Sequence, residues 1–483
     1  MLGWIDKRTG FVTMAQEFLI EDVPGGASYW YVFGSATLFA MIVQITTGIF
    51  LTFFYAPSAT TAWESTKAIY DNPFQHYMLS IHYWGASAMI ALVFLHLLQV
   101  LIWGAYKAPR ELQWIVGVIL LLVTLALGLT GYLLPWDMNA YFASQVSLNI
   151  TGGAPVLGPL MQNIAQGGGT MGTNTINRFF GLHVWLMPAA LIGLVGAHLA
   201  IFRHNGGAGP VVEDPRTLKP GRFFPNQIFM DTVASFLIFV IILFLAAVLP
   251  PFLDAKADPN VFFVPYPAWY FLSLFGLLRL APPQLELIAT IGVPTIFLIV
   301  LMLIPWIDRS TTRSYGSRRP ILWGTFVVVF AIIGLSIYSQ VAIMANQAQA
   351  ASTPTAAAPV TAAAAPGGGG SVVTTSNSGG AKVFAQNCAS CHGATGSGQS
   401  GAIPPLANNT FVTGDPHKVI DVVLNGLHGN VSVNGQNYNG MMPAWKGSLS
   451  NSDIASVVTY IRGSLGNNKA GAVKESDVAA RKK

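Results

Sequence analysis

The stretch HYWGASAMIALVFLH, residues 82–96, begins and ends with histidine and is otherwise almost wholly apolar. A second stretch, HVWLMPAALIGLVGAH at residues 183–198, has the same design. The histidines within a stretch are 14 residues apart in the first and 15 in the second. Both separations are close to four turns of α-helix, so each pair is predicted to lie on one helix face, roughly 21–23 Å apart along the axis.

The composition places these stretches in a membrane. Hydrophobic residues make up 52% of the 483 residues and charged residues only 9%, whereas soluble domains carry roughly 25% charged residues. A soluble globule, a disordered chain and a disulfide scaffold are therefore excluded. The net charge of +5 is too small and too scattered for nucleic-acid binding, so we expect no nucleic-acid partner.

Apolar runs long enough to cross a hydrocarbon core of about 30 Å predict seven transmembrane helices. They lie at about Ser28–Tyr55, Tyr77–Gly104, Trp114–Leu134, Phe180–Phe202, Ile228–Pro251, Leu285–Ile307 and Ile321–Ile343. The fold class expected is an all-α membrane protein with a four-helix bundle, three further spans and a small soluble α-helical domain.

The distribution of basic residues predicts the orientation, because Lys and Arg accumulate on the cytoplasmic side of a membrane. Twelve lie in the N-terminal segment and in the second-to-third, fourth-to-fifth and sixth-to-seventh connections, against four in the remaining connections. The N-terminus is therefore expected in the cytoplasm of a bacterial cell, and everything after Ile343 on the outer, periplasmic side.

The four histidines form two depth-matched pairs. Both helices are predicted to run from outside to inside, so His82 matches His183 near the outer surface and His96 matches His198 near the inner surface. A single histidine in a membrane could be satisfied by a neighbour's backbone, but polar groups at this depth are costly. Four at two matched depths favour two haem b groups, each held by two imidazoles.

Glycines repeat the same spacing on the neighbouring predicted helices. Gly34 and Gly48 on the first span, and Gly117 and Gly131 on the third, are each separated by 14 residues. A missing side chain lets a flat, bulky ring approach the backbone, although glycine is common in transmembrane helix interfaces in any case.

The C-terminal part of the chain has a different composition. Residues 345–380 are almost entirely Ala, Pro, Thr, Ser and Gly, which predicts a linker. The sequence Cys388-Ala-Ser-Cys391-His392 that follows is the C-x-x-C-H signature of covalent haem attachment. A redox or zinc pair would need a thioredoxin-like context or further ligands, and the sequence offers neither.

This region resembles the class I cytochromes c through the run Gly440-Met-Met-Pro-Ala-Trp445. The resemblance implies Met442, which precedes the proline, as the second axial ligand of haem c, with Met441 as its packing neighbour. Ser450 and Asp453 have the spacing of a capping box, and Ile454, Val457, Val458 and Ile461 follow at helical spacing. The charged tail after Gly466 is expected to be mobile.

The membrane part, from about Glu17 to Tyr338, resembles cytochrome b of the cytochrome bc family. The 15-residue histidine spacing and the runs KAPREL (107–112) and GYLLPW (131–136) are similar to the split, chloroplast-type protein joined to its partner, subunit IV. The resemblance implies quinol oxidation near the outer face. One electron would go to a Rieske iron–sulfur protein, and the other would cross through both haems and reduce quinone near the inner face.

The resemblance also divides the chain into parts and locates quinone sites. The parts are 1–225 (di-haem domain), 226–344 (subunit-IV-like), 345–380 (linker), 381–466 (cytochrome c) and 467–483 (charged tail). The outer quinol pocket would include Tyr132, Asp137, Pro267, Trp269 and Tyr270. The run Pro267–Tyr270 corresponds to the family's P-E-W-Y motif, but Ala268 replaces the glutamate that usually takes the second quinol proton.

The inner quinone site implied by the resemblance would include Arg203 and Asp231. His204 is a further candidate there, although a solvent-facing histidine is an equal alternative. Arg110 and Arg178 are placed to pair with haem propionates, or alternatively to anchor the helices at the membrane surface.

Together these features predict the cytochrome b and c subunit of a proton-translocating quinol oxidoreductase. The partners expected are a Rieske protein, membrane quinol and quinone, a soluble cytochrome c or cupredoxin as acceptor, and a second copy of the chain in a homodimer. The alternative is an electron-transfer conduit without bifurcating quinol oxidation, and Ala268 is the feature that favours it.

Overall fold

The computed structural model describes residues 2–168, 170–212, 217–259, 263, 265–352, 375–393, 395–398, 403–427, 431–438, 442, 445–446 and 449–482. Over these residues the chain is predominantly α-helical, with two short two-stranded sheets, β1–β2 and β3–β4. It divides into two compact units. The first comprises Met1–Lys256, Tyr266–Ala281 and Leu285–Met344, and the second Ala257–Pro265, Pro282–Gln284 and Ala345–Lys483.

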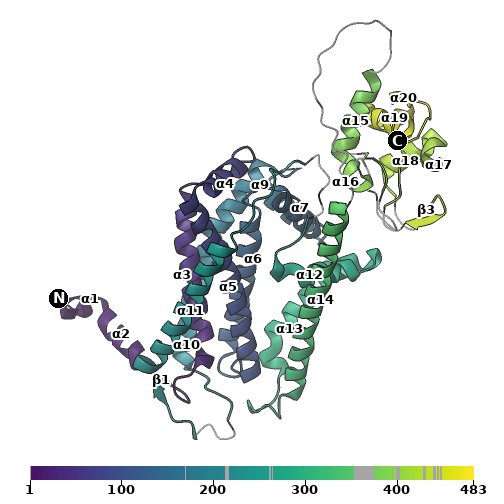
Figure 1. Ribbon diagram of the computed structural model, residues 1–483. Helices are drawn as coiled ribbons and strands as arrows, with labels where there is room; N and C mark the ends of the chain where they lie inside the picture. Colours follow the sequence, from purple (N-terminus) through teal and green to yellow (C-terminus); the bar gives the residue numbers. More distant parts are fainter. Residues whose placement is uncertain are drawn as a thin grey trace. The chain divides into compact units, whose positions relative to one another are not determined.

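The described residues contain seven helices that are long and apolar enough to cross a membrane, which confirms the predicted number and places (Figure 1). They are Tyr29–Thr52, Pro73–Trp103, Glu111–Tyr132, Thr173–Asn205, Phe223–Val248, Ile288–Ile307 and Arg319–Ala345. The chain is therefore a multi-pass membrane protein of the all-α class.

The elements of the first unit follow one another mainly as helices joined by short connections. In chain order they are α1 (Leu2–Thr9), α2 (Phe11–Leu19), β1 (Asp22–Val23), α3 (Val32–Thr52), α4 (Ala62–Asp71), α5 (Pro73–Trp103), α6 (Glu111–Tyr132), α7 (Met138–Gly152), α8 (Gly158–Gln166), α9 (Thr173–Gly181), η2 (Leu182–Leu186), α10 (Met187–Asn205), β2 (Gly221–Arg222), η4 (Phe223–Gln227), α11 (Ile228–Val248), η5 (Trp269–Phe271), α12 (Leu272–Leu280), η7 (Ile288–Gly292), α13 (Val293–Ile307) and α14 (Arg319–Ser352).

Two of the membrane helices contain a widened π turn immediately before a proline. In η2 the Met187 N–H bonds to the Leu182 carbonyl, and in η7 the Val293 N–H bonds to that of Ile288, both five residues back. Pro188 and Pro294 follow directly, and proline has no N–H and crowds the carbonyl four residues earlier. The wider turn relieves this crowding, and π turns are frequent at functional sites.

Four of the membrane helices pack as two pairs, α3 with α5 and α6 with α10, and α11 covers α3 and α5. Between the two pairs lies a core of Ala36, Ala40, Met41, Met89, Leu92 and Leu191. Met89 and Leu92 of α5 and Leu191 of α10 lie near the midpoints between the two histidines of their stretches, and the other three residues belong to α3. The centre of the bundle is therefore filled by apolar side chains, above and below which the histidines lie.

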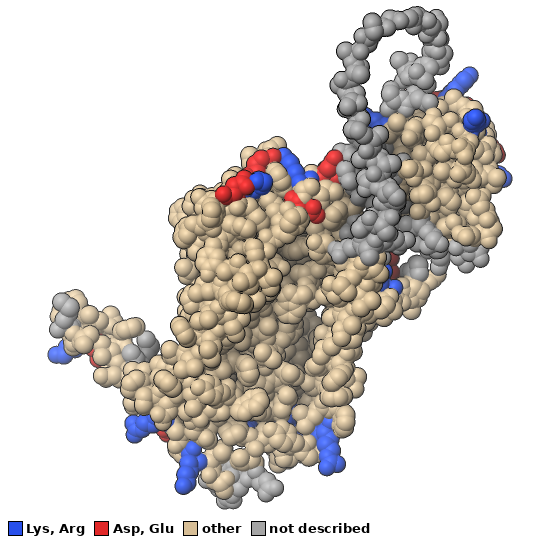
Figure 2. Space-filling model, in the orientation of Figure 1, with Lys and Arg blue, Asp and Glu red and all other residues tan. Residues whose placement is uncertain are grey.

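Charged side chains in the first unit lie at its two ends, on either side of an uncharged band (Figure 2). At the end where α5 meets α6, Asp308 accepts hydrogen bonds from Tyr106 at 2.5 Å and from Arg318 at 3.0 Å, and forms an ion pair with Lys107 at 3.1 Å. The Arg318 guanidinium is fully buried and also donates to the carbonyls of Leu101 and Ile102. This network joins the α5–α6 connection to the α13–α14 connection.

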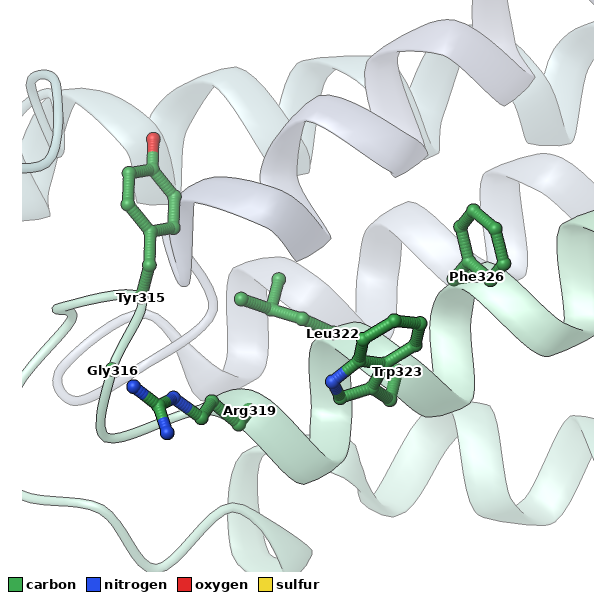
Figure 3. Close-up of a pocket in the computed structure, with 6 residues that line it drawn as sticks. All are labelled: Tyr315, Gly316, Arg319, Leu322, Trp323 and Phe326. Carbon is green, nitrogen blue, oxygen red and sulfur yellow. The ribbon is translucent and has the colours of Figure 1, made fainter.

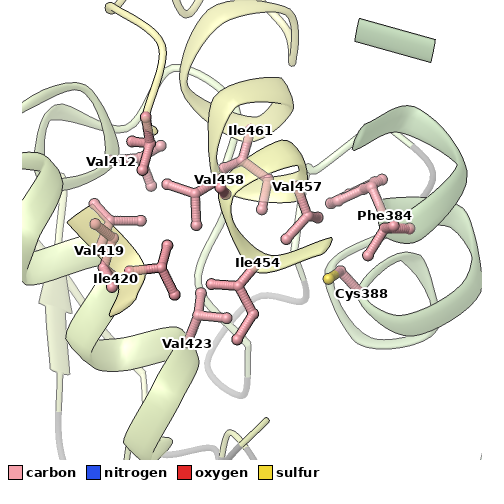
Figure 4. Close-up of a cluster of buried hydrophobic side chains, with 14 of the residues drawn as sticks. Phe384, Cys388, Val412, Val419, Ile420, Val423, Ile454, Val457, Val458 and Ile461 are labelled. Atoms are coloured by element: carbon pink, nitrogen blue, oxygen red, sulfur yellow. The ribbon is translucent and has the colours of Figure 1, made fainter. Parts of the chain in front are cut away.

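The second unit has its own apolar core (Figure 4). Its elements are α15 (Thr375–Asn387), α16 (Ala389–His392), α17 (Thr410–Thr413), α18 (Pro416–Asn425), β3 (Val431–Val433), β4 (Gln436–Tyr438), α19 (Asn451–Gly463) and α20 (Glu475–Arg481). The predicted capping box is confirmed, because Ser450 Oγ accepts from Asp453 N at 3.0 Å and the Asp453 carboxylate accepts from Ser450 N at 3.3 Å. The four predicted apolar residues of α19 are all buried.

The C-terminal tail differs from the expectation that it is mobile. Val473 and Val478 are buried in the core of the second unit, and the Val473 N–H donates to Thr459 Oγ1 at 2.9 Å. Arg481 pairs with Asp421 of α18. The two buried valines, the hydrogen bond to Thr459 and the ion pair to Asp421 together hold the tail against the second unit. Within the predicted linker, α14 continues to Ser352 and α15 begins at Thr375, and residues 353–374 lie outside the described residues.

We predict that Asp308→Asn destabilises the protein strongly, because it leaves the buried Arg318 and Lys107 charges without their counterion. Removing one partner of a buried ion pair costs about 3–5 kcal/mol. Burial alone raises the pKa of Asp308, but hydrogen bonds from Ser310, Tyr106, Lys107 and Arg318 outweigh it and hold this pKa well below its ordinary value.

The readout is the temperature at which the detergent-solubilised protein loses helical circular dichroism, with the exposed Asp22→Asn as control. Because the folded pKa is depressed, the contribution of Asp308 is fully present above the ordinary carboxyl pKa near 4 and is lost as the pH falls below it. If Asp308→Asn and Asp22→Asn lose helical circular dichroism at the same temperature at pH 7, the Asp308 network contributes nothing to stability.

Candidate haem and quinone sites

The histidines predicted at the outer level, His82 of α5 and His183 of η2, face each other. A Cβ atom on Gly48 of α3 would lie 3.2 Å from Cε1 of His82, and one on Gly131 of α6 would lie 2.6 Å from Cε1 of His183. The imidazole centroids are 6.2 Å apart, with ring planes at 77°. Two imidazoles that bind one metal ion from opposite sides through bonds of about 2.0–2.1 Å have centroids roughly 6.3 Å apart, so these residues fit a bis-imidazole iron.

Hydrogen bonds fix the tautomers of this first pair. The Thr47 hydroxyl donates to the Val43 carbonyl at 2.7 Å, so it accepts from Nδ1–H of His82 at 2.9 Å. Nδ1–H of His183 donates to the Leu127 carbonyl at 3.0 Å. Each ring therefore keeps its lone pair on Nε2, the atom that binds a metal when Nδ1–H is held by an acceptor.

The second pair, His96 of α5 and His198 of α10, repeats the arrangement at the other level. A Cβ atom on Gly34 would lie 3.4 Å from Cε1 of His96, and one on Gly117 would lie 3.3 Å from Cε1 of His198. The two imidazoles are close enough to interact electrostatically. Their Nδ1 atoms are buried and meet no partner with hydrogen-bond geometry, so this pair lacks the bonds that fix the tautomers of the first pair.

Tyr132, which is predicted for the outer quinol pocket, is bound by Asn139, a residue that the sequence analysis did not single out. The Tyr132 hydroxyl donates to the Tyr266 carbonyl at 3.0 Å and accepts from the Asn139 amide, whose oxygen accepts from Tyr266 N at 3.0 Å. The end of α6, the start of α7 and the segment before Pro267 are thereby tied together. Only the polarity of Asn139, two residues after Asp137, could have indicated it.

Tyr270 and Trp269 of the P-A-W-Y run meet two other helices. A Cβ atom on Gly128 of α6 would lie 2.8 Å from the Tyr270 hydroxyl oxygen, so glycine is needed for Tyr270 to pack there. Trp269 is half exposed, and its Nε1–H donates to Ser87 of α5 at 3.3 Å. Pro267 directly precedes Ala268, the N-cap residue of η5.

Asp137 has a structural task in addition to its predicted one. One carboxylate oxygen caps α7 by accepting from Ala140 N at 2.8 Å, and the other accepts from Asp254 N at 3.2 Å. The residue is 8% exposed. Burial raises the pKa of Asp137, and the two backbone hydrogen bonds partly oppose that rise.

The residues predicted for the inner quinone site do not form one cluster in the described contacts. Arg203 Nη1 lies 3.7 Å from Glu21 Oε2. Asp231 accepts from Gln227 Nε2 at 2.9 Å, and Gln227 also binds the backbone of Ser28. His204 is exposed, as the solvent-facing alternative predicted.

Arg110 and Arg178 both donate to main-chain carbonyls. Arg110 holds the carbonyls of Gly206 at 3.1 Å and Gly207 at 3.2 Å, and Arg178 holds those of Asn163 and Ile164. The Arg110 bonds stabilise the segment after α10, and the Arg178 bonds stabilise the last turn of α8. Both agree with the alternative that these arginines anchor the helices.

In the second unit the C-x-x-C-H segment lies on α16 against the apolar core. His392 is 6% exposed, and its Nδ1 donates to the Pro404 carbonyl at 3.0 Å, which leaves Nε2 available as a ligand. Cys388 belongs to the buried core, and Met442 packs against the same core. Two backbone bonds to Leu427, of 2.9 and 3.1 Å, hold Met442 in place. The side chain of Cys391 and the whole of Met441 lie outside the described residues.

A hollow of about 460 Å³ at the start of α14 contains none of the predicted site residues (Figure 3). Its lining is largely aromatic and aliphatic with one arginine, and consists of Tyr315, Gly316, Arg319, Leu322, Trp323 and Phe326. The haem and quinone candidates therefore lie elsewhere, in the bundle and at its ends.

Three family models match successive parts of the chain. Residues 87–258 match the model described as cytochrome b (N-terminal)/b6/petB, residues 260–358 match cytochrome b (C-terminal)/b6/petD, and residues 378–464 match cytochrome c. The first two matches lie on the membrane helices and the third on the second unit.

Curated proteins and a solved structure are similar over long stretches. The menaquinol:cytochrome c reductase cytochrome b subunit of Geobacillus thermodenitrificans is 40% identical over 44% of this chain and 98% of its own length. The cytochrome bc complex cytochrome b subunit of Chlorobaculum thiosulfatiphilum is 33% identical over 71% and 82%. A chain of a hyperthermophilic respiratory complex III has a TM-score of 0.62 and 28% identity, and the match covers 70% of this chain and 91% of that one.

The glycine contacts give a direct test of the first histidine pair. We predict that Gly131→Val displaces the His183 imidazole and removes one of two haem b groups from the purified protein, because even a Cβ atom at this position lies 2.6 Å from Cε1. Haem b and haem c are quantified separately by pyridine haemochrome spectra. Gly193→Val on α10 is the matched control, since a Cβ there meets nothing within 4 Å. A full haem b content in Gly131→Val would contradict the assignment.

Proposed function

The chain belongs to the cytochrome b family of cytochrome bc complexes and carries a cytochrome c domain, and from this we propose that it is the b and c subunit of a quinol:electron-acceptor oxidoreductase. The observation that carries the proposal is the juxtaposition of His82 and His183 with centroids 6.2 Å apart, repeated by His96 and His198 at the other level. Relatives named menaquinol:cytochrome c reductase subunits support a quinol as the electron donor.

Four histidines and a C-x-x-C-H segment would hold the cofactors. His82 with His183 and His96 with His198 would each bind one haem b, while Cys388 and Cys391 would attach haem c, with His392 and Met442 as its axial ligands. When bound, these groups supply reversible one-electron transfer. The protein's own part is to fix the imidazole tautomers through Thr47 and Leu127 and to leave room for flat rings through its glycines.

We place quinol oxidation at the predicted outer end, where Tyr132, Trp269 and Tyr270 would line the pocket. Asn139 holds the Tyr132 hydroxyl against the Tyr266 backbone, so Tyr132 is a fixed hydrogen-bonding group. Quinone reduction would take place at the opposite end, near Arg203 and Asp231. Proton release on one side and uptake on the other would translocate charge.

The remaining partners follow from the same proposal. A Rieske protein would receive one of the two electrons, and a soluble cytochrome c or cupredoxin would take electrons from the second unit. The excess of basic residues on one set of connections supports a cytoplasmic N-terminus and a periplasmic cytochrome c unit. We expect two copies of the chain in the working complex.

The alternative is a membrane electron-transfer conduit that lacks bifurcating quinol oxidation and is coupled to a non-Rieske partner, and Ala268 favours it because the P-E-W-Y acid is missing. The test is quinol:cytochrome c reductase activity of the complex purified from its native membrane, with and without stigmatellin. We expect inhibitor-sensitive activity and a copurifying Rieske protein. Reduction of haem b only by a non-quinol partner, insensitive to the inhibitor, would establish the conduit instead.

Restoring the missing acid should change proton release. We predict that Ala268→Glu shifts the half-maximal rate of quinol oxidation to lower pH, because an added carboxylate accepts a proton where the wild-type route is already protonated. Ala268→Gln has the same size without an ionisable group and is the control. Identical pH profiles for the two variants would exclude a proton role at this position.

The assignment of Met442 predicts a change in potential. Met442→His should retain haem c but lower its midpoint potential, because methionine ligation raises the potential of a c-type haem relative to bis-histidine ligation. A redox titration of the c-type absorption band measures this. An unchanged potential would mean that Met442 is not the axial ligand.

A further inference from the structure

A second hollow of about 460 Å³ lies between α4, the start of α5 and residues 251–255, near the end of the membrane unit that carries the proposed quinol pocket. Ionisable side chains are concentrated in its lining. They are Lys67, Tyr70 and Asp71 of α4, His76 of α5, and Asp254. No part of the proposed haem or quinone chemistry uses these residues.

His76 is the unexplained group of this hollow. Its imidazole lies on the Tyr70 ring, with centroids 4.4 Å apart, and its Nε2 atom is buried without a hydrogen-bond partner. A buried polar nitrogen without a partner is rare and costly in native proteins. Its position in the wall of a polar hollow, beside Asp71 and Asp254, is suited to exchanging a proton with water that enters there.

Asp254 connects this hollow to Asp137. Its backbone N–H donates to the Asp137 carboxylate at 3.2 Å, and its carbonyl accepts from Trp63 Nε1 at 2.9 Å. Both of these bonds use main-chain atoms, and one carboxylate oxygen of Asp254 accepts from the Ala255 backbone N–H at 2.8 Å. Electrostatic repulsion from the Asp254 carboxylate also contributes to the raised pKa of Asp137.

Asp137 in turn is coupled to the tyrosines of the proposed quinol pocket. It interacts electrostatically with Tyr132 and Tyr266, and also with Tyr70 of the hollow. Because burial raises the pKa of Asp137, its carboxyl holds a proton at higher pH than an exposed aspartate. Lys256, the nearest cation along the chain to Asp254, is engaged by Glu64.

We propose that Asp137, Asp254 and His76 form the route by which a quinol proton leaves for the outer solution, taking the place of the acid missing at Ala268. This inference rests on the proposed function. Oxidation of one quinol yields one quinone, two electrons and two protons. The electrons would go to the Rieske protein and to the b-type haems. One proton would leave on the side of the Rieske protein, and the other would move through Asp137 to Asp254 and then, by way of water in the hollow, to His76 and the exterior.

The test uses the intact complex in proteoliposomes, with Asp254→Asn and His76→Gln as variants and the exposed His417→Gln of the second unit as control. Three quantities are measured from pH 5.5 to 9: the rate of quinol-driven haem b reduction, proton release to the outside with a pH-indicating dye, and haem content. We expect each variant to keep its haems and to slow both rates by about tenfold or more at pH 6, with recovery at high pH, as for the loss of a general base.

The outcomes separate this inference from the proposed function. If the wild type oxidises quinol and both variants match the control in rate and pH profile, the route is wrong and the proposed function remains. If the wild type reduces its haem b groups from no quinol, the proposed function fails and the route fails with it. If Asp254→Asn has a lowered haem content, the slower rate could come from the lost haem. Asp254→Glu then decides, because it restores the rate only if the carboxylate itself carries the proton.

Discussion

The close approach of a glycine to an imidazole, repeated four times, is the constraint on which the membrane unit depends. Each histidine ring lies against a neighbouring helix at a position where a Cβ atom would be 2.6–3.4 Å from Cε1. The packing of α3 on α5 and of α6 on α10 is therefore set by these contacts, with each helix pair presenting two imidazoles at two depths. A larger residue at any of the four positions would separate the helices or rotate a ring out of line.

Other features of the bundle serve the same constraint. The π turn at Leu182–Leu186 places His183 opposite His82 immediately before Pro188, where a regular helix would leave a crowded carbonyl. The apolar core between the levels keeps water out of the bundle centre. Thr47 and Leu127, on the neighbouring helices, then fix the ring tautomers of His82 and His183, so contacts between helices determine which nitrogen of these two rings is available to a metal.

Periodic features could be predicted from the sequence because they depend on near neighbours. The seven spans, the Ser450–Asp453 capping box and the buried face of α19 are of this kind, and all are confirmed. Most contacts between residues far apart in the chain could not be predicted in this way. Asn139 bonds to Tyr266 and Asp308 to Tyr106, far apart in the chain, and Val478 docks a tail whose charge suggested mobility. The residue-level roles at the haem and quinone sites stay predictions, supported by geometry in the histidine pairs and the cytochrome c unit.

The buried Asp308 network has a consequence for how such a protein can be divided. Tyr106 and Lys107 belong to the part of the chain before residue 260, and Asp308 and Arg318 belong to the part after it. A further bond joins the same two parts, because Trp114 Nε1–H donates to the Leu301 carbonyl at 2.8 Å. These specific polar contacts align the two parts with each other, and they do not depend on the stretch of backbone that links the parts. If the gene were interrupted between them, we would expect the two polypeptides still to recognise each other. A covalent link at this point is then not required for the two parts to assemble.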